Sequence, residues 1–77
     1  IEARIAALHA LGNFKDQGAV TFLRSRMLTD PNPDIRIAAA EGLQIADYDA
    51  AKPMIEQALA AERDEALQER LRNLLSQ

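Results

Sequence analysis

Cysteine and tryptophan are absent from this chain of 77 residues, and valine occurs only once. Without cysteine there is no disulfide, no thiolate ligand for a metal and no cysteine nucleophile. The scarcity of strand formers excludes an all-β domain. No apolar run approaches the roughly 20 residues that cross a bilayer, so we expect no direct membrane insertion. A chain without cysteine suits either redox environment, and of the compartments a cytoplasmic one is favoured over an extracytoplasmic one.

Positive charge and aromatic side chains are also in short supply. Asp and Glu outnumber Lys and Arg by 12 to 9, the net charge is −3, and aromatic residues make up 4% of the chain. Nucleic-acid binding depends on clustered positive charge and, for single strands, on aromatic side chains that stack on bases. We therefore expect no nucleic-acid partner.

The residues that catalysis requires are not grouped along the chain. His9 is the only histidine, and both serines lie far from it in the sequence. The combination of Asp16, Asp47 and Asp49 lacks the dense ligand series of a calcium loop, and helix-end aspartates are the better interpretation. No glycine-rich phosphate loop occurs. These absences predict a protein that is not an enzyme and that carries no cofactor and no metal.

What the chain does contain is a helix-forming composition with an internal repeat. Ala supplies 15, Leu 10 and Ile 6 of its apolar residues. Residues 4–7 (Arg-Ile-Ala-Ala) recur unchanged as residues 36–39, which is a shift of 32 positions. A match at a fixed period of this size indicates stacked repeat units. We expect one domain over 1–77, with units at about 1–32 and 33–64 and a partial unit at 65–77.

Apolar residues within each unit follow the three-to-four spacing of a helix. The pattern predicts helices over 2–12, 17–29, 33–46, 49–61 and 64–75. The link Asp30-Pro31-Asn32-Pro33-Asp34 is the sharpest boundary, because Pro31 ends the preceding helix while Asn32 and Pro33 suit the start of the next one. Pro53 is expected in the first turn of its helix, where a missing N–H is tolerated.

The first-helix motif Ile35-Arg36-Ile37-Ala38-Ala39 through Leu43, the Asp-Pro link before it and the second-helix pattern Ala19 to Phe22-Leu23 resemble HEAT-like repeats of the short type named after phycobilisome lyases. This resemblance covers essentially the whole chain. It implies an all-α superhelix of stacked antiparallel hairpins, about two and a half repeats long, with a right-handed sense of stacking. Gln44 and Gln68 depart from the pattern, which suggests a divergent third unit.

Two arginines recur at the repeat period. Arg4 and Arg36 both lie in the first turn of a predicted helix, where a positive charge opposes the helix dipole. We expect acids of a neighbouring unit to compensate them, and Asp16 and Asp30 are the candidates. Their predicted role is structural pairing between repeats. Arg36 in particular is expected to bond an acid or a loop carbonyl of the preceding unit.

The predicted function is protein–protein interaction, because stacked hairpins offer their second helices as an extended concave face. The candidate protein-binding residues on that face, together with neighbouring Thr21, are Arg24, Ser25, Lys52, Glu56 and Gln57. Arg24 aligns with Glu56, and Ser25 with Gln57, so the face varies while the core repeats. The partner is therefore expected to be a protein.

An alternative is an accessory or regulatory repeat segment of a larger protein. It could be a chromophore-lyase-like subunit, which rests on fold analogy alone, or a repeat region attached to a transporter or a signalling protein. The chain begins at Ile1 rather than at methionine, and we expect it to be a fragment or a processed product of a larger parent chain.

Overall fold

Five α-helices make up the structure, a computed structural model that describes residues 1–77. They are α1 (Glu2–Gly12), α2 (Gln17–Thr29), α3 (Pro33–Ala46), α4 (Tyr48–Ala61) and α5 (Glu65–Leu75). The all-α prediction is confirmed, and α1, α2 and α3 have the predicted bounds. None of the five helices combines the length and apolarity that a membrane crossing demands.

Polar side chains cap the starts of α2, α3, α4 and α5 and explain where these four helices begin. The Asp16 carboxylate accepts a hydrogen bond from the Ala19 N–H at 2.7 Å, and Asn32 accepts one from the Asp34 N–H at 2.8 Å. Such caps satisfy N–H groups that have no partner within the helix. The two predicted starts that were wrong by one residue follow the same rule. Asp47 caps α4 and Asp64 caps α5, so these helices begin directly after each cap.

Pro53 is a further correction, because it lies inside α4 and not in its first turn. A proline at this position cannot donate a backbone hydrogen bond to the carbonyl of Asp49, four residues earlier. Pro53 and Asp49 are both exposed, so water can satisfy that carbonyl. The helix therefore tolerates the proline because of its solvent-facing position.

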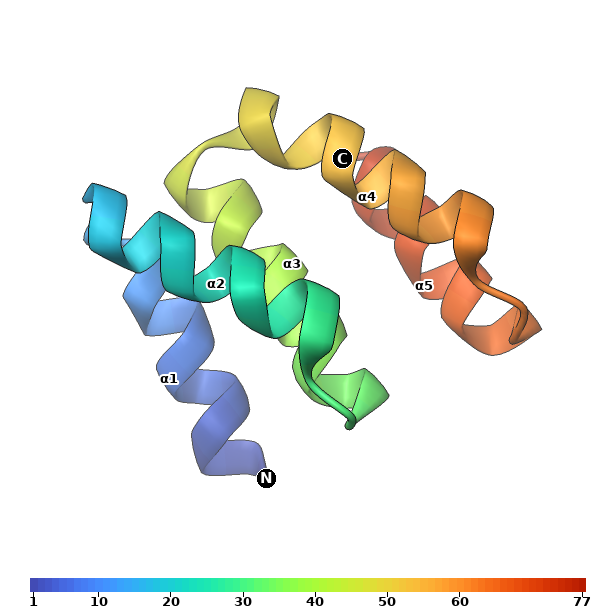
Figure 1. The fold of residues 1–77 in the computed structure, drawn as a ribbon, viewed down its shortest axis with the longest axis horizontal. Coiled ribbons are helices and arrows are strands. Elements are labelled where there is room, and N and C mark those ends of the chain that lie inside the picture. The colour runs from blue at the N-terminus through green and yellow to red at the C-terminus, as the bar shows by residue number, and fades with distance from the viewer.

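The helices form two layers, and α3 lies at the centre of the packing. In Figure 1, α2 and α4 lie nearer to the viewer, while α1, α3 and α5 lie behind them. Helix α3 packs against each of the other four helices. The largest fully buried side chains are contributed by α2, α3 and α4 and are Leu23, Ile35, Leu43 and Ile55. Leu23 and Ile55 lie at equivalent positions of the two hairpins, so each second helix inserts the same core residue.

Glycine allows α1 and α3 to approach closely. A Cβ atom at Gly12 would lie 2.3 Å from the carbonyl oxygen of Gly42, and one at Gly42 would lie 2.5 Å from that of Leu8. Both distances are too short for a side chain without displacement of the helices. These two glycines therefore allow α1 and α3 to cross in direct backbone contact.

Phe14 and Phe22 lie outside the core, although both fit the apolar spacing of the first unit. Phe14 is 70% exposed and Phe22 is 49% exposed, while neighbouring Leu23 is completely buried. Adjacent residues on a helix point about 100° apart, so Phe22 and Leu23 cannot both face α3. The first hairpin consequently carries two aromatic side chains on its surface.

Candidate functional site

A groove between α2 and α4 is the candidate functional site. It consists of two adjoining hollows of about 380 and 280 Å³, which share Met54 and Gln57 in their lining. Figure 1 shows the two helices side by side in the front layer, and α3 lies behind the space between them. The groove is therefore formed by the second helices of two successive hairpins.

The floor of the groove is apolar and its walls carry polar groups. Leu43 of α3 lies at the base of the larger hollow, with Val20 and Met54 beside it. Arg24 belongs to the α2 wall, and Gln57 belongs to the α4 wall. Such an arrangement offers apolar contact area together with a few groups that can orient a ligand.

The end of the groove nearest the C-termini of α2 and α4 carries both signs of charge. Arg36 and Glu62 line the smaller hollow there, together with Met27 and Leu28. The Leu28 side chain is 61% exposed on this wall. An exposed leucine beside an apolar hollow is a surface that a partner can cover.

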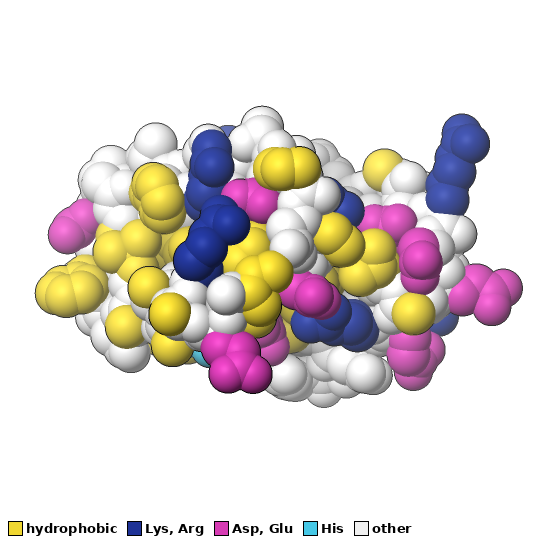
Figure 2. All heavy atoms as spheres, turned by 90° about the horizontal axis from the view of Figure 1, so that it is seen from below, with side chains coloured by type: hydrophobic (Ala, Val, Ile, Leu, Met, Phe, Trp, Pro, Cys, Tyr) yellow, Lys and Arg dark blue, Asp and Glu magenta, His cyan; other side chains and the backbone are white.

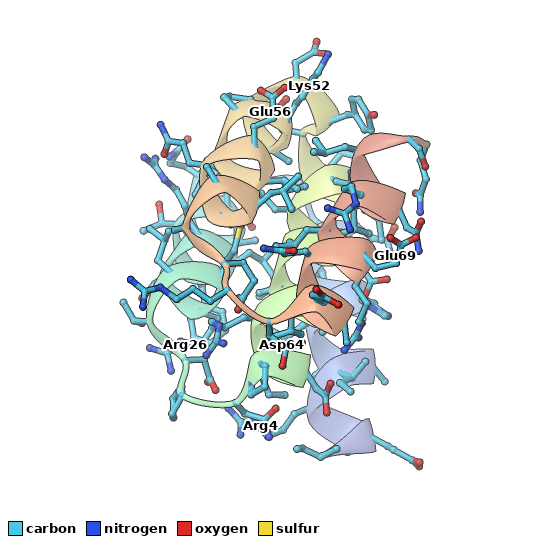
Figure 3. The ribbon with its side chains drawn as sticks, turned by 90° about the vertical axis from the view of Figure 1, so that its right-hand side faces the viewer. Arg4, Arg26, Lys52, Glu56, Asp64 and Glu69 are labelled. Atoms are coloured by element: carbon cyan, nitrogen blue, oxygen red, sulfur yellow. The ribbon has the colours of Figure 1, made fainter.

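The structure brings together two of the five predicted binding residues. Arg24 and Gln57 line the same hollow, but Ser25, Lys52 and Glu56 line neither of the two. Figure 3 shows Lys52 and Glu56 projecting from the outer edge of α4, away from α2. Because Lys52 and Glu56 are one helical turn apart, they share that outer side. The backbone carbonyl of Ser25 accepts a hydrogen bond from the Thr29 hydroxyl at 2.7 Å.

The sequence interpretation missed the apolar lining of the groove. Met54 directly precedes the fully buried Ile55 and is itself only partly buried. Spacing alone does not separate the two members of such a pair, because adjacent residues of a helix can both be buried, as Ile37 to Ala40 of α3 are. Leu28 forms a similar pair with Met27, which is buried while Leu28 is 61% exposed.

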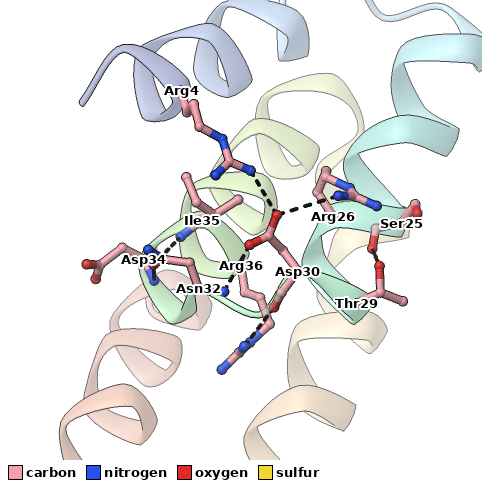
Figure 4. A network of polar contacts seen from close by, with 9 residues as sticks. All are labelled: Arg4, Ser25, Arg26, Thr29, Asp30, Asn32, Asp34, Ile35 and Arg36. Atoms are coloured by element: carbon pink, nitrogen blue, oxygen red, sulfur yellow. Dashed lines mark hydrogen bonds and ion pairs between the residues drawn. The ribbon is translucent and has the colours of Figure 1, made fainter. Parts of the chain in front are cut away.

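Asp30 organises the link between α2 and α3, which joins the two hairpins. One carboxylate oxygen accepts a hydrogen bond from the Arg4 guanidinium at 3.0 Å and lies 3.6 Å from that of Arg26. Its other oxygen accepts from the Asn32 N–H at 2.9 Å. The carbonyl oxygen of Asp30 accepts from Arg36 at 2.8 Å. Figure 4 shows these contacts converging on Asp30 from α1, α2 and α3.

These contacts lower the pKa of Asp30. The main cause is the hydrogen bond from the Asn32 N–H, followed by the charges of Arg4 and Arg26, and together they outweigh the effect of burial, which raises the pKa. The Asp30 side chain is only 2% exposed. A carboxylate enclosed in this way persists as a charge because donors surround it. It therefore ties three helices together in the ionised form.

The two recurrent arginines have different partners. Arg36 donates to the carbonyl of the residue six positions earlier, and Gln68 makes the same contact with the Glu62 carbonyl at 2.7 Å. Gln68 therefore replaces an arginine without loss of this bond. Arg4 instead bonds to the Asp30 side chain, within the expected first unit rather than across a unit boundary. The carboxylate of Asp16, the other candidate acid, caps α2.

His9 lies against Glu41 on the side of the molecule formed by the first helices. Its Nε2 is 2.9 Å from a carboxylate oxygen of Glu41, 32 positions later in the chain. Equivalent positions of α1 and α3 are thus adjacent, as stacking requires. No group of three or more His, Cys, Asp or Glu side chains is placed to hold a metal ion.

Comparison with known families agrees with this architecture. Residues 1–76 match the family of HEAT repeats. The chain therefore belongs to the HEAT repeat family, whose members are generally scaffolds for protein interaction. No curated protein and no solved structure matches the chain significantly.

Proposed function

We propose that this chain is a non-catalytic protein-binding module that holds a segment of its partner in the groove between α2 and α4. The observation that carries the proposal is an open groove with an apolar floor, walled by Arg24 and Gln57 and bordered by the exposed Leu28. Methionine and arginine are enriched at protein interfaces, which supports the same interpretation.

The groove also indicates what its partner offers. Apolar side chains of a bound segment would cover Met54 and Leu28, and an acidic side chain would pair with Arg24. Stable interfaces bury about 1,200–2,000 Å² in total, more than a single short groove supplies. We therefore expect weak binding by this part of the chain alone.

A site-specific photocrosslinker tests this proposal. It is placed at Gln57, inside the groove, and in a matched protein at Lys52, on the outer side of α4. Crosslinked partners from cells of the source organism are identified by mass spectrometry. We expect a specific protein from position 57 and not from position 52. Equal capture at both positions, or none at position 57, would contradict the assignment of the groove.

A second candidate function is a repeat segment that stabilises or regulates a larger protein. The exposed aromatic side chains of the first hairpin favour it, because Phe14 and Phe22 would be covered in a larger assembly.

A further inference from the structure

The groove between α2 and α4 has a charge opposite to that of the whole chain. The net charge of the chain is −3, and Figure 2 shows acidic side chains spread over one face from end to end. The charged residues that line the two hollows of the groove are Arg24, Arg36 and a single acid, Glu62. The groove is therefore locally basic on an acidic protein.

Neither arginine of the groove is paired with a carboxylate. The arginines that form ion pairs are Arg4, Arg26, Arg70 and Arg72. Arg24 is exposed and forms none. Arg36 donates one N–H to the Asp30 carbonyl at 2.8 Å, and Figure 4 shows its guanidinium on the side of Asp30 away from Arg4. Both positive charges are thus available to a ligand in the groove.

Glu62 does not neutralise these charges. Its carboxylate accepts hydrogen bonds from the N–H groups of Arg63 and Asp64, each at 3.1 Å, in the link to α5. It forms no ion pair with Arg36, which is half-buried. Solvent and salt screen a partly buried charge less than an exposed one, so a carboxylate brought by a partner would interact strongly with Arg36.

The spacing of the two arginines defines the ligand further. Arg24 precedes Asp30 by six residues, and at 1.5 Å per residue this is about 9 Å along α2. The Arg36 guanidinium is held beside the Asp30 carbonyl, at the far end of that stretch. Met54 lines both hollows and so lies between the two charges. A matching ligand carries two carboxylates about 9 Å apart, with an apolar group between them.

We propose that the groove selects an acidic segment of its partner, in which two Asp or Glu residues flank an apolar side chain. This inference rests on the proposed function of the groove and names the chemistry of the partner. An extended chain advances about 3.3 Å per residue, so the two acids are three residues apart. One acid pairs with Arg24 and the other with Arg36, while the apolar side chain covers Met54 and Leu28.

Disulfide tethering tests the proposal without knowledge of the partner. The chain has no cysteine, so Gln57→Cys introduces a single thiol between the two arginines. The probes are the peptide acetyl-Glu-Cys-Leu-Glu-amide and the same peptide with Gln in place of both Glu residues. Each is equilibrated with the variant in a thiol–disulfide buffer at low salt, and mass spectrometry measures the mixed disulfide. We expect the acidic peptide to be captured about tenfold more strongly, from two ion pairs together.

Two further substitutions in the Gln57→Cys protein separate charge from structure. Arg36→Gln removes the charge but can keep the bond to the Asp30 carbonyl, because Gln68 makes the equivalent bond to the Glu62 carbonyl at 2.7 Å. Arg24→Gln removes the other charge at an exposed position. Each should reduce the preference for the acidic peptide about threefold, and both together should abolish it. Lys52→Cys, on the outer side of α4, is the matched control and should show no preference for the acidic peptide.

Three results would overturn the proposal. They are equal capture of both peptides at position 57, a preference that survives both arginine substitutions, and the same preference at position 52. If the photocrosslinker at Gln57 captures a protein but the tethered peptides show no preference, the groove binds a partner and the inference about its acidity fails. A preference for the acidic peptide without any captured protein would instead support this inference and contradict the proposed function.

Discussion

The side-chain amide of Gln44 donates a hydrogen bond of 2.8 Å to the carbonyl oxygen of Leu74 and so connects α3 to α5. Gln44 and Leu74 occupy the positions at which Gly12 and Gly42 bring α1 and α3 together, 32 residues earlier. Helices α1 and α3 thus meet through close backbone contact, whereas a longer polar side chain connects α3 to α5. The same repeat therefore accommodates two different helix separations.

This relationship predicts different responses to alanine at two glycines. Gly12→Ala should lower the free energy of unfolding by about 1–3 kcal/mol, because its Cβ atom would overlap the Gly42 carbonyl. Gly18→Ala is the matched control. Its Cβ atom would meet only the Asp16 carboxylate, at 3.3 Å, and alanine is the better helix former, so stability should stay the same or rise by about 0.5 kcal/mol. Urea unfolding followed by circular dichroism measures both, and equal effects would refute the close contact.

The hydrogen bond from Gln44 to the Leu74 carbonyl predicts a smaller effect on the free energy of unfolding. Gln44→Ala removes the donor to the Leu74 carbonyl, and a typical hydrogen bond contributes about 0.5–1.5 kcal/mol to stability. We expect a loss in that range, with hydrogen exchange accelerated in α5 more than in α1. If exchange increased equally in both helices, the bond would not be the specific connection to α5.

The lowered pKa of Asp30 predicts a pH-dependent contribution to stability. Because the folded state lowers this pKa, the ionised carboxylate stabilises the fold above the ordinary Asp pKa, and that contribution is lost as pH falls through the lowered value. Asp30→Asn should therefore lower Tm by several degrees at pH 7, and the difference from the original chain should shrink towards zero in acid.

Asp34→Asn serves as the control for this comparison. Asp34 pairs with Arg70 at 2.8 Å, but both side chains are about half exposed, and exposed ion pairs contribute little. Its Tm should change only slightly at pH 7. A difference between Asp30→Asn and the original chain that stays constant from pH 7 to pH 2 would show that charge is not what Asp30 contributes.

Adjacent apolar residues on α2 give a prediction about the core. Leu23→Ala removes a completely buried side chain and should cost about 2–5 kcal/mol, a large part of the stability of a domain of this size. Phe22→Ala removes a larger but half-exposed side chain and should cost about 1 kcal/mol or less. Chemical denaturation of the two variants gives the comparison. A greater loss of stability from Phe22→Ala than from Leu23→Ala would show that Phe22, and not Leu23, is the core residue.

The same pair shows what the sequence can predict and where it fails. The helix bounds follow from local chemistry, since Asp16, Asn32 and Asp64 cap helices with their own side chains. The choice of Leu23 over Phe22 depends on the direction from which α3 approaches. That direction is a tertiary property, set in part by the Gly12–Gly42 contact, and no local pattern contains it.

The candidate site was predicted in part for the same reason. The period places Arg24 and Gln57 on second helices, but the tilt between α2 and α4 decides which residues line the space between them. Lys52 and Glu56 lie one turn apart on the outer side of α4, and spacing alone does not distinguish the inner side from the outer one.

The groove between α2 and α4 predicts variants that lose binding without losing stability. Leu28 is 61% exposed, so Leu28→Asp should leave the free energy of unfolding within about 0.5 kcal/mol of its original value. Arg24→Glu reverses a charge on the wall of the groove and should be similarly neutral for folding.

Once the partner captured at position 57 is identified, each of these two groove variants should weaken its binding by about tenfold or more, because a few central residues dominate interface energy. Lys52→Glu, which reverses a charge outside the groove, should bind normally in the same fluorescence anisotropy titration. Binding that survives both groove substitutions but is lost with Lys52→Glu would assign the interface to the outer side of α4.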